Sequence, residues 1–375
     1  MSAPATRQAD GRLDVVEPTL ASEAGHCGLL LRSLHAAAPA LAITVWAGKG
    51  SQRLFADLGS VELVGHFSRR WRKLQAYFLY RRLLRAGGPI LVPTAGRFDL
   101  EAIARAAAGP VGPNRVFLYF HRLALSPTKA RALRRIARRQ PNLVTIGTTR
   151  AIEARLRDLG FEATGVMLPM PPRPPAAATG GAAAEPFRRV VVAGAARADK
   201  GFHHAVALVE AILRRQLQMP IALQVSGDHY ARHDPVTRSA LRRLAHVHSP
   251  LVATLPQTLD APGFADLLRG GICLQPYEPD EYADKISAIT LDALNAGSPI
   301  VTVDGTWMAD IARRFGCGEV AASNDPDELL AALERVRRDY ATYARRALAA
   351  AAELDAEERW QPLLSRLGLE GRSST

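Results

Sequence analysis

The stretch Tyr282–Val301, YADKISAITLDALNAGSPIV, decides how the second half of the chain is read. It contains two acids, Asp284 and Asp292, separated by seven residues, and it ends in a short apolar run. Gly297 predicts the end of a short helix directly before that run, which is typical of a buried strand. We therefore expect Asp284 in a loop, Asp292 on the helix about two turns later, and a strand after it.

The same alternation of strand and helix runs along the whole chain. We expect strands at eight apolar runs: Leu41–Gly48, Pro89–Ala95, Arg115–His121, Leu143–Thr149, Arg188–Ala195, Ile221–Gly227, Gly270–Tyr277 and Ser298–Asp304. Helix-length amphipathic stretches lie between most of them, which favours parallel sheets covered by helices on both faces. The predicted fold class is α/β, with two doubly wound halves.

A segment rich in proline, alanine and glycine, Leu168–Phe187, separates the two halves. Its composition is typical of a linker, and a chain of 375 residues is long for one domain. The predicted organisation is an N-terminal domain over 1–167, a linker over 168–187, a C-terminal domain over 188–340 and a helical tail over 341–375.

Composition excludes several classes of protein. With 48% apolar and 22% charged residues the chain is not disordered, and no apolar run reaches the roughly 18 residues of a membrane span. The first residues show neither the basic flank nor the apolar core of a signal peptide, so a soluble cytoplasmic protein is expected. Cys27, Cys273 and Cys317 form no CxxC pair, which makes a disulfide framework or a metal site improbable.

The net charge of +12 attracts nucleic acid, anionic membrane or phosphorylated small molecules. Much of it lies in helices rich in alanine and arginine, such as Lys129–Gln140, where a solvated face explains it. The sequence has no helix-turn-helix, zinc-ligand or RNA-binding signature, so no nucleic-acid partner is expected.

Cations follow the predicted strand Arg188–Ala195. Arg197, Lys200 and Gly201 form a turn that opens a helix, and in parallel sheets ligands bind beyond the carboxyl ends of the strands. Two cations where free helix amides already favour anions indicate a diphosphate site; a solvated turn closed by glycine is the alternative. Gly227, beyond the next strand, is a weaker candidate.

The acids of the opening stretch could bind sugar hydroxyls. Asp292 could accept both hydroxyls of a ribose, and Asp284 a hydroxyl of a second sugar. Lys285 and Ser287 could bind phosphate oxygens. Two acids on a surface helix are more often solvated, but their order after the cationic turn favours a functional site.

That order of elements resembles the retaining nucleotide-sugar glycosyltransferases of the GT-B fold, family 4 type (group 1). The resemblance covers about 188–335 and is carried by AGAARADKG (Ala193–Gly201), by Asp284-x7-Asp292 and most specifically by LDALNAGSPIV (Leu291–Val301). It implies two Rossmann-like domains facing across a cleft, Arg197 and Lys200 on the donor diphosphate, and Asp292 on the ribose.

This chain also departs from the family pattern. Both acids are aspartate instead of glutamate, and KIS replaces the glycine-rich loop after the first acid. PYEPDEYADKIS is similar to a subset of the family in which Tyr282, Lys285 and Ser287 match; there Lys285 and Ser287 would help to bind the diphosphate, and Asp284 would be incidental.

In the N-terminal half the resemblance is looser. Glu23–Leu34 looks like the family's first glycine turn and helix, which makes Gly25 and His26 candidates near the acceptor. His121, beyond a strand, is a candidate for the histidine that the family keeps in this domain. A lone histidine is more often structural.

The function implied is transfer of a hexosyl group, with retention, from a nucleoside-diphosphate sugar to a saccharide or lipid-linked acceptor. Surface polysaccharide or glycolipid synthesis is the expected setting. Arg197 and Lys200 would stabilise the leaving diphosphate, with His26 near the reaction, so neither cofactor nor metal is expected. The alternatives are a GT-B protein kept for binding or scaffolding without transferase activity, and a sugar-nucleotide epimerase.

One further segment, Gly65–Arg85, places Phe67, Trp71, Leu74 and Phe78 at helical spacing among many cations. Such a helix could lie in an anionic membrane surface, with the protein peripheral at the inner membrane face. Alternatively, its aromatic stripe packs against the N-terminal sheet.

Overall fold

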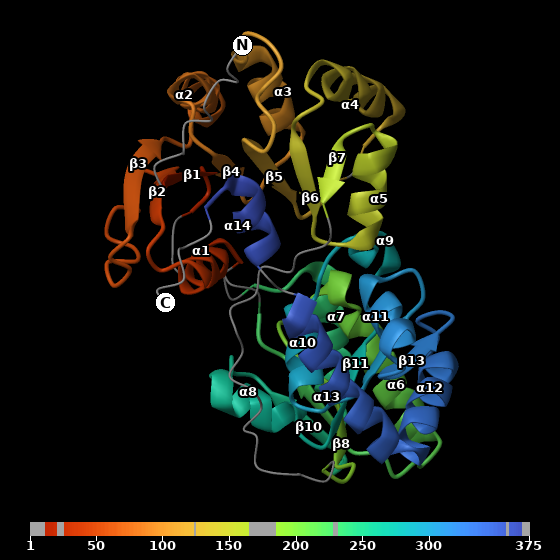
Figure 1. Cartoon of the computed structure of the whole chain (residues 1–375). Helices are drawn as coiled ribbons and strands as arrows, with labels where there is room; N and C mark the ends of the chain where they lie inside the picture. The colour runs from red at the N-terminus through yellow and green to blue at the C-terminus, as the bar shows by residue number, and fades with distance from the viewer. Residues whose placement is uncertain are drawn as a thin grey trace. The chain divides into compact units, whose positions relative to one another are not determined.

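The computed structural model describes residues 12–20, 26–123, 125–164, 185–227, 232–357 and 360–369. The chain forms two compact units, Met1–Arg173 with Glu357–Thr375, and Pro174–Ala356 (Figure 1). Most of the predicted linker, 168–184, lies outside the described residues. The predicted tail is helical where described, and its last helix belongs to the first unit.

The first unit is built on a seven-stranded parallel sheet in the order β3-β2-β1-β4-β5-β6-β7. Its strands are β1 (Arg12–Glu17), β2 (Ala42–Gly48), β3 (Val61–Phe67), β4 (Ile90–Val92), β5 (Val116–Phe120), β6 (Val144–Gly147) and β7 (Glu162–Thr164). Its helices are α1 (His26–Ala37), α2 (Arg72–Ala86), α3 (Arg97–Ala106), α4 (Pro127–Arg139), α5 (Arg150–Asp158) and α14 (Gln361–Leu367).

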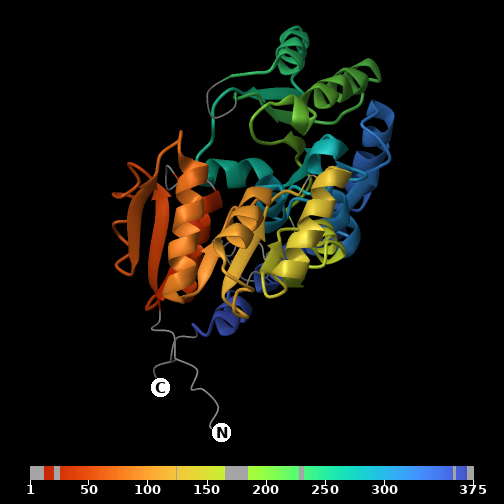
Figure 2. The ribbon, with the colours of Figure 1, turned by 90° about the horizontal axis from the view of Figure 1, so that it is seen from above.

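Alternate residues of the buried strands supply two cores, one on each face of this sheet. In β5, Val116, Leu118 and Phe120 pack with α2 to α5, whereas Phe117 and Tyr119 pack with α1 and α14. This is the alternation that a pleated strand imposes on its side chains. Helix α14, from the end of the chain, thus completes the first unit (Figure 2).

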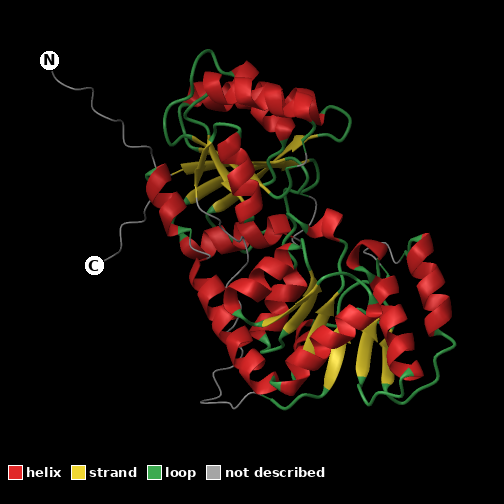
Figure 3. Cartoon of the chain, turned by 90° about the vertical axis from the view of Figure 1, so that its right-hand side faces the viewer, coloured by secondary structure: helices red, strands yellow, loops and turns green. Residues whose placement is uncertain are grey.

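The second unit has a six-stranded parallel sheet in the order β10-β9-β8-β11-β12-β13. Its strands are β8 (Arg189–Val192), β9 (Ile221–Gln224), β10 (Val252–Leu255), β11 (Gly271–Gln275), β12 (Ile300–Val303) and β13 (Gly318–Ala321). Its helices are α6 (Phe202–Arg214), α7 (Pro235–Leu244), α8 (Ala261–Leu268), α9 (Pro279–Tyr282), α10 (Ala288–Asn295), α11 (Trp307–Phe315), α12 (Pro326–Arg338) and α13 (Tyr340–Glu357). Helices flank this sheet on both sides (Figure 3).

Local sequence explains where several of these helices begin. Asp234 and Asp325 are the N-caps of α7 and α12, and each accepts a hydrogen bond from a backbone N–H of the first turn. A proline follows each of them, where its fixed φ suits the first helical position and no N–H is lost. The Asp-Pro pairs therefore set the starts of these helices.

All eight predicted strands are present, so the α/β, doubly wound prediction is confirmed. The prediction of one helical stripe through Gly65–Arg85 is wrong at its start, because Phe67 is buried at the end of β3 and α2 begins at Arg72. Each sheet reverses its direction of growth once, between β1 and β4 and between β8 and β11. Ligands bind at such reversal points, beyond the carboxyl ends of the strands.

Candidate active site

The reversal point of the second sheet brings the two predicted segments together. The turn after β8 carries Arg197 and Lys200, and the loop after β11 carries Tyr282, Lys285 and Ser287. The backbone N–H of Glu278 donates to the carbonyl oxygen of Asp199 at 3.1 Å, which joins loop and turn directly. The structure therefore brings together two segments that the sequence predicted separately.

Two glycines allow this close approach. Gly201 has φ +63°, and a β-carbon there would lie 1.6 Å from the carbonyl oxygen of Pro276. Gly194 has φ +86°, and its β-carbon would meet Ile289 and the Nζ atom of Lys200 at 2.4 and 3.0 Å. Any side chain at Gly201 would push the turn away from the loop.

Lys200 is a half-buried cation of the site that lacks an ion pair with any residue that the structure describes. Its Nζ lies 5.9 Å from the ring centroid of Tyr277. Burial, and after it the charge of Arg197, lowers the pKa of Lys200 from 10.5 to about 8. A desolvated cation of this kind favours a bound anion.

Arg197 is already engaged by Asp199, a residue that the sequence analysis did not single out. The Nε atom donates to Oδ1 at 2.8 Å, and Nη2 donates to Oδ2 of the same carboxylate. Asp199 also accepts from the hydroxyl of Tyr282 at 3.5 Å. The two predicted diphosphate cations are therefore unequal, since Arg197 already has a carboxylate counter-ion and Lys200 has no ion-pair partner among the described residues.

The turn is held in place by Asp234. Its carboxylate accepts from the backbone N–H of Ala198 at 3.0 Å and from that of Thr237 at 2.8 Å. Burial raises the pKa of Asp234, but the hydrogen bonds from Thr237 and Ala198 outweigh this effect and lower it to about 2. This acid stays ionised at neutral pH and holds the turn that carries Arg197 and Lys200.

The loop after β11 is organised by a buried polar network around Gln275. Its amide nitrogen donates to Ser287 Oγ at 3.2 Å, and its amide oxygen accepts from Thr290 Oγ1 at 2.9 Å. Ser287 is the buried N-cap of α10. The structure thus gives Ser287 a structural role in addition to the predicted role in binding.

The remaining predicted residues of this unit lie around the same edge. Lys285 pairs with Glu281, with Nζ 2.5 Å from Oε2. Asp284 is half-buried in the loop, and Asp292 is half-buried on α10, as expected. The charge of Asp292 is one cause, after burial, of the raised pKa of the Cys273 thiol on β11. Gly227 follows β9 and precedes residues that are not described.

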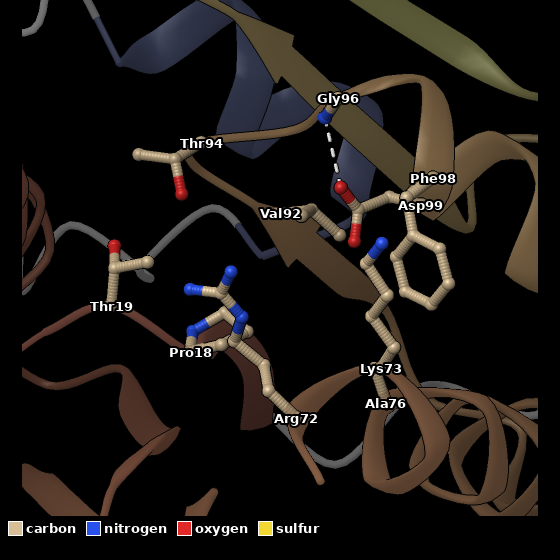
Figure 4. A pocket seen from close by; sticks show the side chains of 10 residues that line it. All are labelled: Pro18, Thr19, Arg72, Lys73, Ala76, Val92, Thr94, Gly96, Phe98 and Asp99. Carbon is tan, nitrogen blue, oxygen red and sulfur yellow. Dashed lines mark hydrogen bonds between the residues drawn. The ribbon is translucent and has the colours of Figure 1, made fainter. Parts of the chain in front are cut away.

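The reversal point of the first sheet holds a pocket of about 210 Å³ that the sequence analysis missed. It is lined by Pro18, Thr19, Arg72, Lys73, Ala76, Val92, Thr94, Gly96, Phe98 and Asp99 (Figure 4). Arg72 and Lys73 extend from α2 toward the loops after β1 and β4, and neither forms an ion pair with a described residue. This pocket is therefore cationic on its α2 side.

Two acids, half-buried Asp99 and buried Glu17, organise the loops around that pocket. Asp99 accepts from the backbone N–H of Gly96 at 2.8 Å and from the hydroxyl of Tyr80 at 2.7 Å. Burial, opposed by these hydrogen bonds, raises the pKa of Asp99. Fully buried Glu17 accepts from Thr94 Oγ1 at 2.5 Å and from Thr19, and so joins the loops after β1 and β4.

The predicted residues of the first unit do not line this pocket. The Nε2 atom of His121 lies 2.9 Å from the carbonyl oxygen of Pro93, so this ring contacts the loop after β4 that also carries Thr94. Gly25 lies outside the described residues, and His26 is described only as the first residue of α1. Thr19 and Thr94 each follow a strand closely, and this position in the sequence could have indicated the pocket.

Comparison with known proteins shows the fold. No protein-family model matches the chain, and no curated protein matches it in sequence. Among solved structures, Anabaena HepE in complex with UDP matches with TM-score 0.65 and 15% identity, covering 95% of this chain and 99% of that one. The E. coli trehalose-6-phosphate structure bound with UDP-2-fluoro glucose gives 0.64 and 12%, covering 96% and 99%.

Sucrose-phosphate synthase from Thermosynechococcus elongatus matches with TM-score 0.60 and 14% identity, covering 95% of this chain and 97% of that chain. These matches span nearly the whole chain and are GT-B structures, so the predicted GT-B fold is confirmed. Identities of this size show the fold alone.

Proposed function

We propose that the chain is a glycosyltransferase that takes a hexosyl group from a nucleoside-diphosphate sugar. The observation that carries this proposal is Lys200, a half-buried cation at the reversal point of the second sheet, without an ion-pair partner among the described residues. A diphosphate bound there would give this partly desolvated cation a direct ion-pair partner. Structures with the same fold bind UDP and a UDP-sugar analogue, which supports this ligand class.

The chemistry follows from where charge develops. Cleavage of the bond between the anomeric carbon and the phosphate oxygen leaves negative charge on the departing diphosphate. Lys200 would stabilise that charge in the transition state. Arg197 would contribute as well if its pairing with Asp199 is broken or shared. Asp292 would bind the ribose hydroxyls. Retention at the anomeric carbon rests on the sequence resemblance, and the reaction as proposed uses no cofactor.

The pocket of the first unit suits the acceptor. Arg72 and Lys73 would bind an anionic group such as a phosphate, and Phe98 offers an apolar face. Thr19, Thr94 and the partly accessible edge of Asp99 could bind sugar hydroxyls. A phosphorylated saccharide or a lipid-linked phosphate would use both sets of groups.

Helix α2 also supports a peripheral membrane setting. Trp71, Leu74 and Phe78 are 58%, 52% and 54% exposed, so the stripe does not pack on the sheet; Ala76, Leu79, Tyr80 and Leu83 do so instead. No described helix has the length and apolar character to cross a bilayer.

Exposed Arg69, Arg70, Arg81 and Arg85 surround that stripe, which complements an anionic lipid surface. We propose that the enzyme acts at the cytoplasmic membrane face, and that it serves surface polysaccharide or glycolipid synthesis, as the sequence resemblance implies.

The two alternatives differ in what they require of the first unit. A sugar-nucleotide epimerase would use Lys200 in the same way but needs no acceptor, so the cationic pocket favours the transferase. A scaffold protein needs no turnover at all.

The test is a thermal-shift screen of UDP, GDP, ADP and their sugars, followed by a transfer assay with phosphorylated sugars and lipid phosphates. A ligand at 100 times its dissociation constant stabilises by about 2.7 kcal/mol. Stabilisation by one nucleotide family together with transfer supports the proposal. Stabilisation without turnover of the donor supports a scaffold, and no stabilisation by any of these ligands removes the proposal.

A further inference from the structure

Two adjacent histidines at the start of α6 meet a carboxylate from the loop after β11. The Nε2 atoms of His203 and His204 lie 3.6 and 3.0 Å from Oε1 of Glu278. One nitrogen of each ring and one carboxylate oxygen lie within 4.8 Å of one another. Over the described ranges, no other three side chains of histidine, cysteine, aspartate or glutamate converge in this way.

Protein contacts alone do not explain the position of His203. Its Nδ1 atom is buried without a hydrogen-bond partner, and its Nε2 is too far from Glu278 for a hydrogen bond. Burying a polar nitrogen without a partner costs free energy. The ring packs instead against that of His204, with centroids 3.9 Å apart.

The geometry of the three groups fits a metal ion. Ligand atoms arranged tetrahedrally at the usual Zn²⁺ bond lengths are about 3.3 Å apart. The two measured separations from Glu278 lie on either side of that value. We propose that His203, His204 and Glu278 form a site for a divalent transition-metal ion, with Zn²⁺ the best match to two imidazoles and one carboxylate. A fourth position remains for water or another ligand.

The charged surroundings permit a cation. Asp234 and Glu278 favour positive charge at His203, and Arg243 opposes it. Arg243 is engaged by Glu210, with Nε 2.8 Å from Oε1.

The ion would link two segments that are distant in sequence. His203 and His204 belong to the first turn of α6, and Glu278 is the N-cap of α9, at the start of the loop that carries Tyr282 and Lys285. The ion would hold the turn and the loop of the candidate active site together. The sequence analysis expected no metal, because the cysteines form no ligand pattern and because Arg197 and Lys200 would stabilise the diphosphate without one. The pairing of the histidines with Glu278 appears only in the folded chain.

The test is metal binding by the full chain, prepared without an affinity tag and freed of metal with a chelator. Zn²⁺ is titrated in competition with a chromophoric chelator at neutral pH, without nucleotide. We expect one tight equivalent per chain, and a loss of affinity of about tenfold or more in both His204→Ala and Glu278→Gln. The matched control replaces His246 and His248, two exposed histidines of the same unit, by alanine and should bind as the parent does.

A melting experiment with and without Zn²⁺ guards against variants that fail to fold. Zn²⁺ should raise the Tm of the parent and of the control, and leave that of folded His203→Gln and Glu278→Gln unchanged. Equal affinity in all variants, loss of binding in the control alone, or no tight equivalent in the parent would overturn the site. Because no nucleotide is present, any of these results leaves the proposed transferase function standing.

Discussion

The guanidinium of Arg197 is bound at two points by Asp199, two residues along the same turn, with Nε 2.8 Å from Oδ1. The neighbouring Lys200 has no such partner among the described residues. A diphosphate that binds at this turn can therefore pair directly with Lys200. To pair with Arg197, it must displace Asp199 or share the guanidinium with it.

Asp199→Asn should strengthen the binding of inorganic pyrophosphate. The substitution removes the competing charge while keeping a polar group beside Arg197. An ion pair of this exposure is worth at most about 1 kcal/mol, so the expected gain is up to roughly fivefold. Calorimetry would measure it, with Asp327→Asn as the control, since that change also removes one surface partner of an arginine. Weaker pyrophosphate binding would instead mean that Asp199 positions Arg197 for the ligand.

The lowered pKa of Lys200 predicts how nucleotide affinity depends on pH. With a pKa of about 8 in the free protein, Lys200 loses its proton as the pH rises beyond 8. UDP affinity should then fall, approaching tenfold per pH unit while the bound lysine stays charged. Lys200→Arg keeps its charge over this range and should flatten the profile between pH 8 and 10. A parent profile that is itself flat there would show that the lysine does not contact the ligand.

The same shift has a consequence for stability. Since the folded pKa lies below the unfolded value of 10.5, the unfolded chain binds more protons between pH 8 and 10.5. The free energy of unfolding therefore gains a favourable contribution from Lys200 as the pH rises through that window, of the order of 3 kcal/mol at most. Denaturant titrations should show this rise in the parent and not in Lys200→Met. An identical pH dependence in the two proteins would mean that Lys200 is solvated.

Asp292→Asn should weaken binding of the nucleoside part of the donor. We expect UDP to lose about 1 to 3 kcal/mol of affinity, and inorganic pyrophosphate to bind as it does to the parent. The comparison of these two ligands separates a ribose contact from a general loss of the site. Equal losses for UDP and pyrophosphate would contradict the assignment of Asp292 to the ribose.

Replacing Trp71 and Phe78 together by alanine should reduce binding to vesicles that contain anionic lipid. Both side chains are more than half exposed, so folding should be nearly unaffected while the apolar contact with the bilayer is lost. Co-sedimentation with anionic and with neutral vesicles would measure the change. The control is Val236→Ser, an exposed apolar side chain of the other unit. Unchanged sedimentation of the double variant would refute the membrane role of α2.

The sequence predicted the inner strands better than the outer ones. Strands β3, β7, β10 and β13 are the edges of the two sheets, and their partly exposed residues give no continuous apolar run. The eight predicted strands lie inside the sheets, where both faces are covered and the runs are apolar. Strand β1 is an inner strand that was not predicted, because Asp14 and Glu17 interrupt its apolar run.

The candidate site shows a similar division. Arg197, Lys200 and the loop after β11 could be predicted because each follows an apolar strand. Asp199 could not be predicted as the partner of Arg197, since it is one polar residue among several in the turn. The pocket residues Arg72 and Lys73 were missed because the sequence of their helix is typical of a basic, solvated surface. Which charges remain uncompensated is decided by tertiary contacts.

The central claim is that Lys200 binds the donor diphosphate, and one calorimetric comparison tests it most directly. UDP, GDP and ADP are titrated into the parent, into Lys200→Met and into Lys129→Met, which removes the same charge from an exposed position on α4. Removing a charge-assisted hydrogen bond to phosphate costs about 1.5 to 3 kcal/mol. The account therefore predicts that the nucleotide that binds the parent binds Lys200→Met roughly 10- to 150-fold more weakly, and binds Lys129→Met as it binds the parent. Equal affinity for that nucleotide in the parent and in Lys200→Met would contradict it.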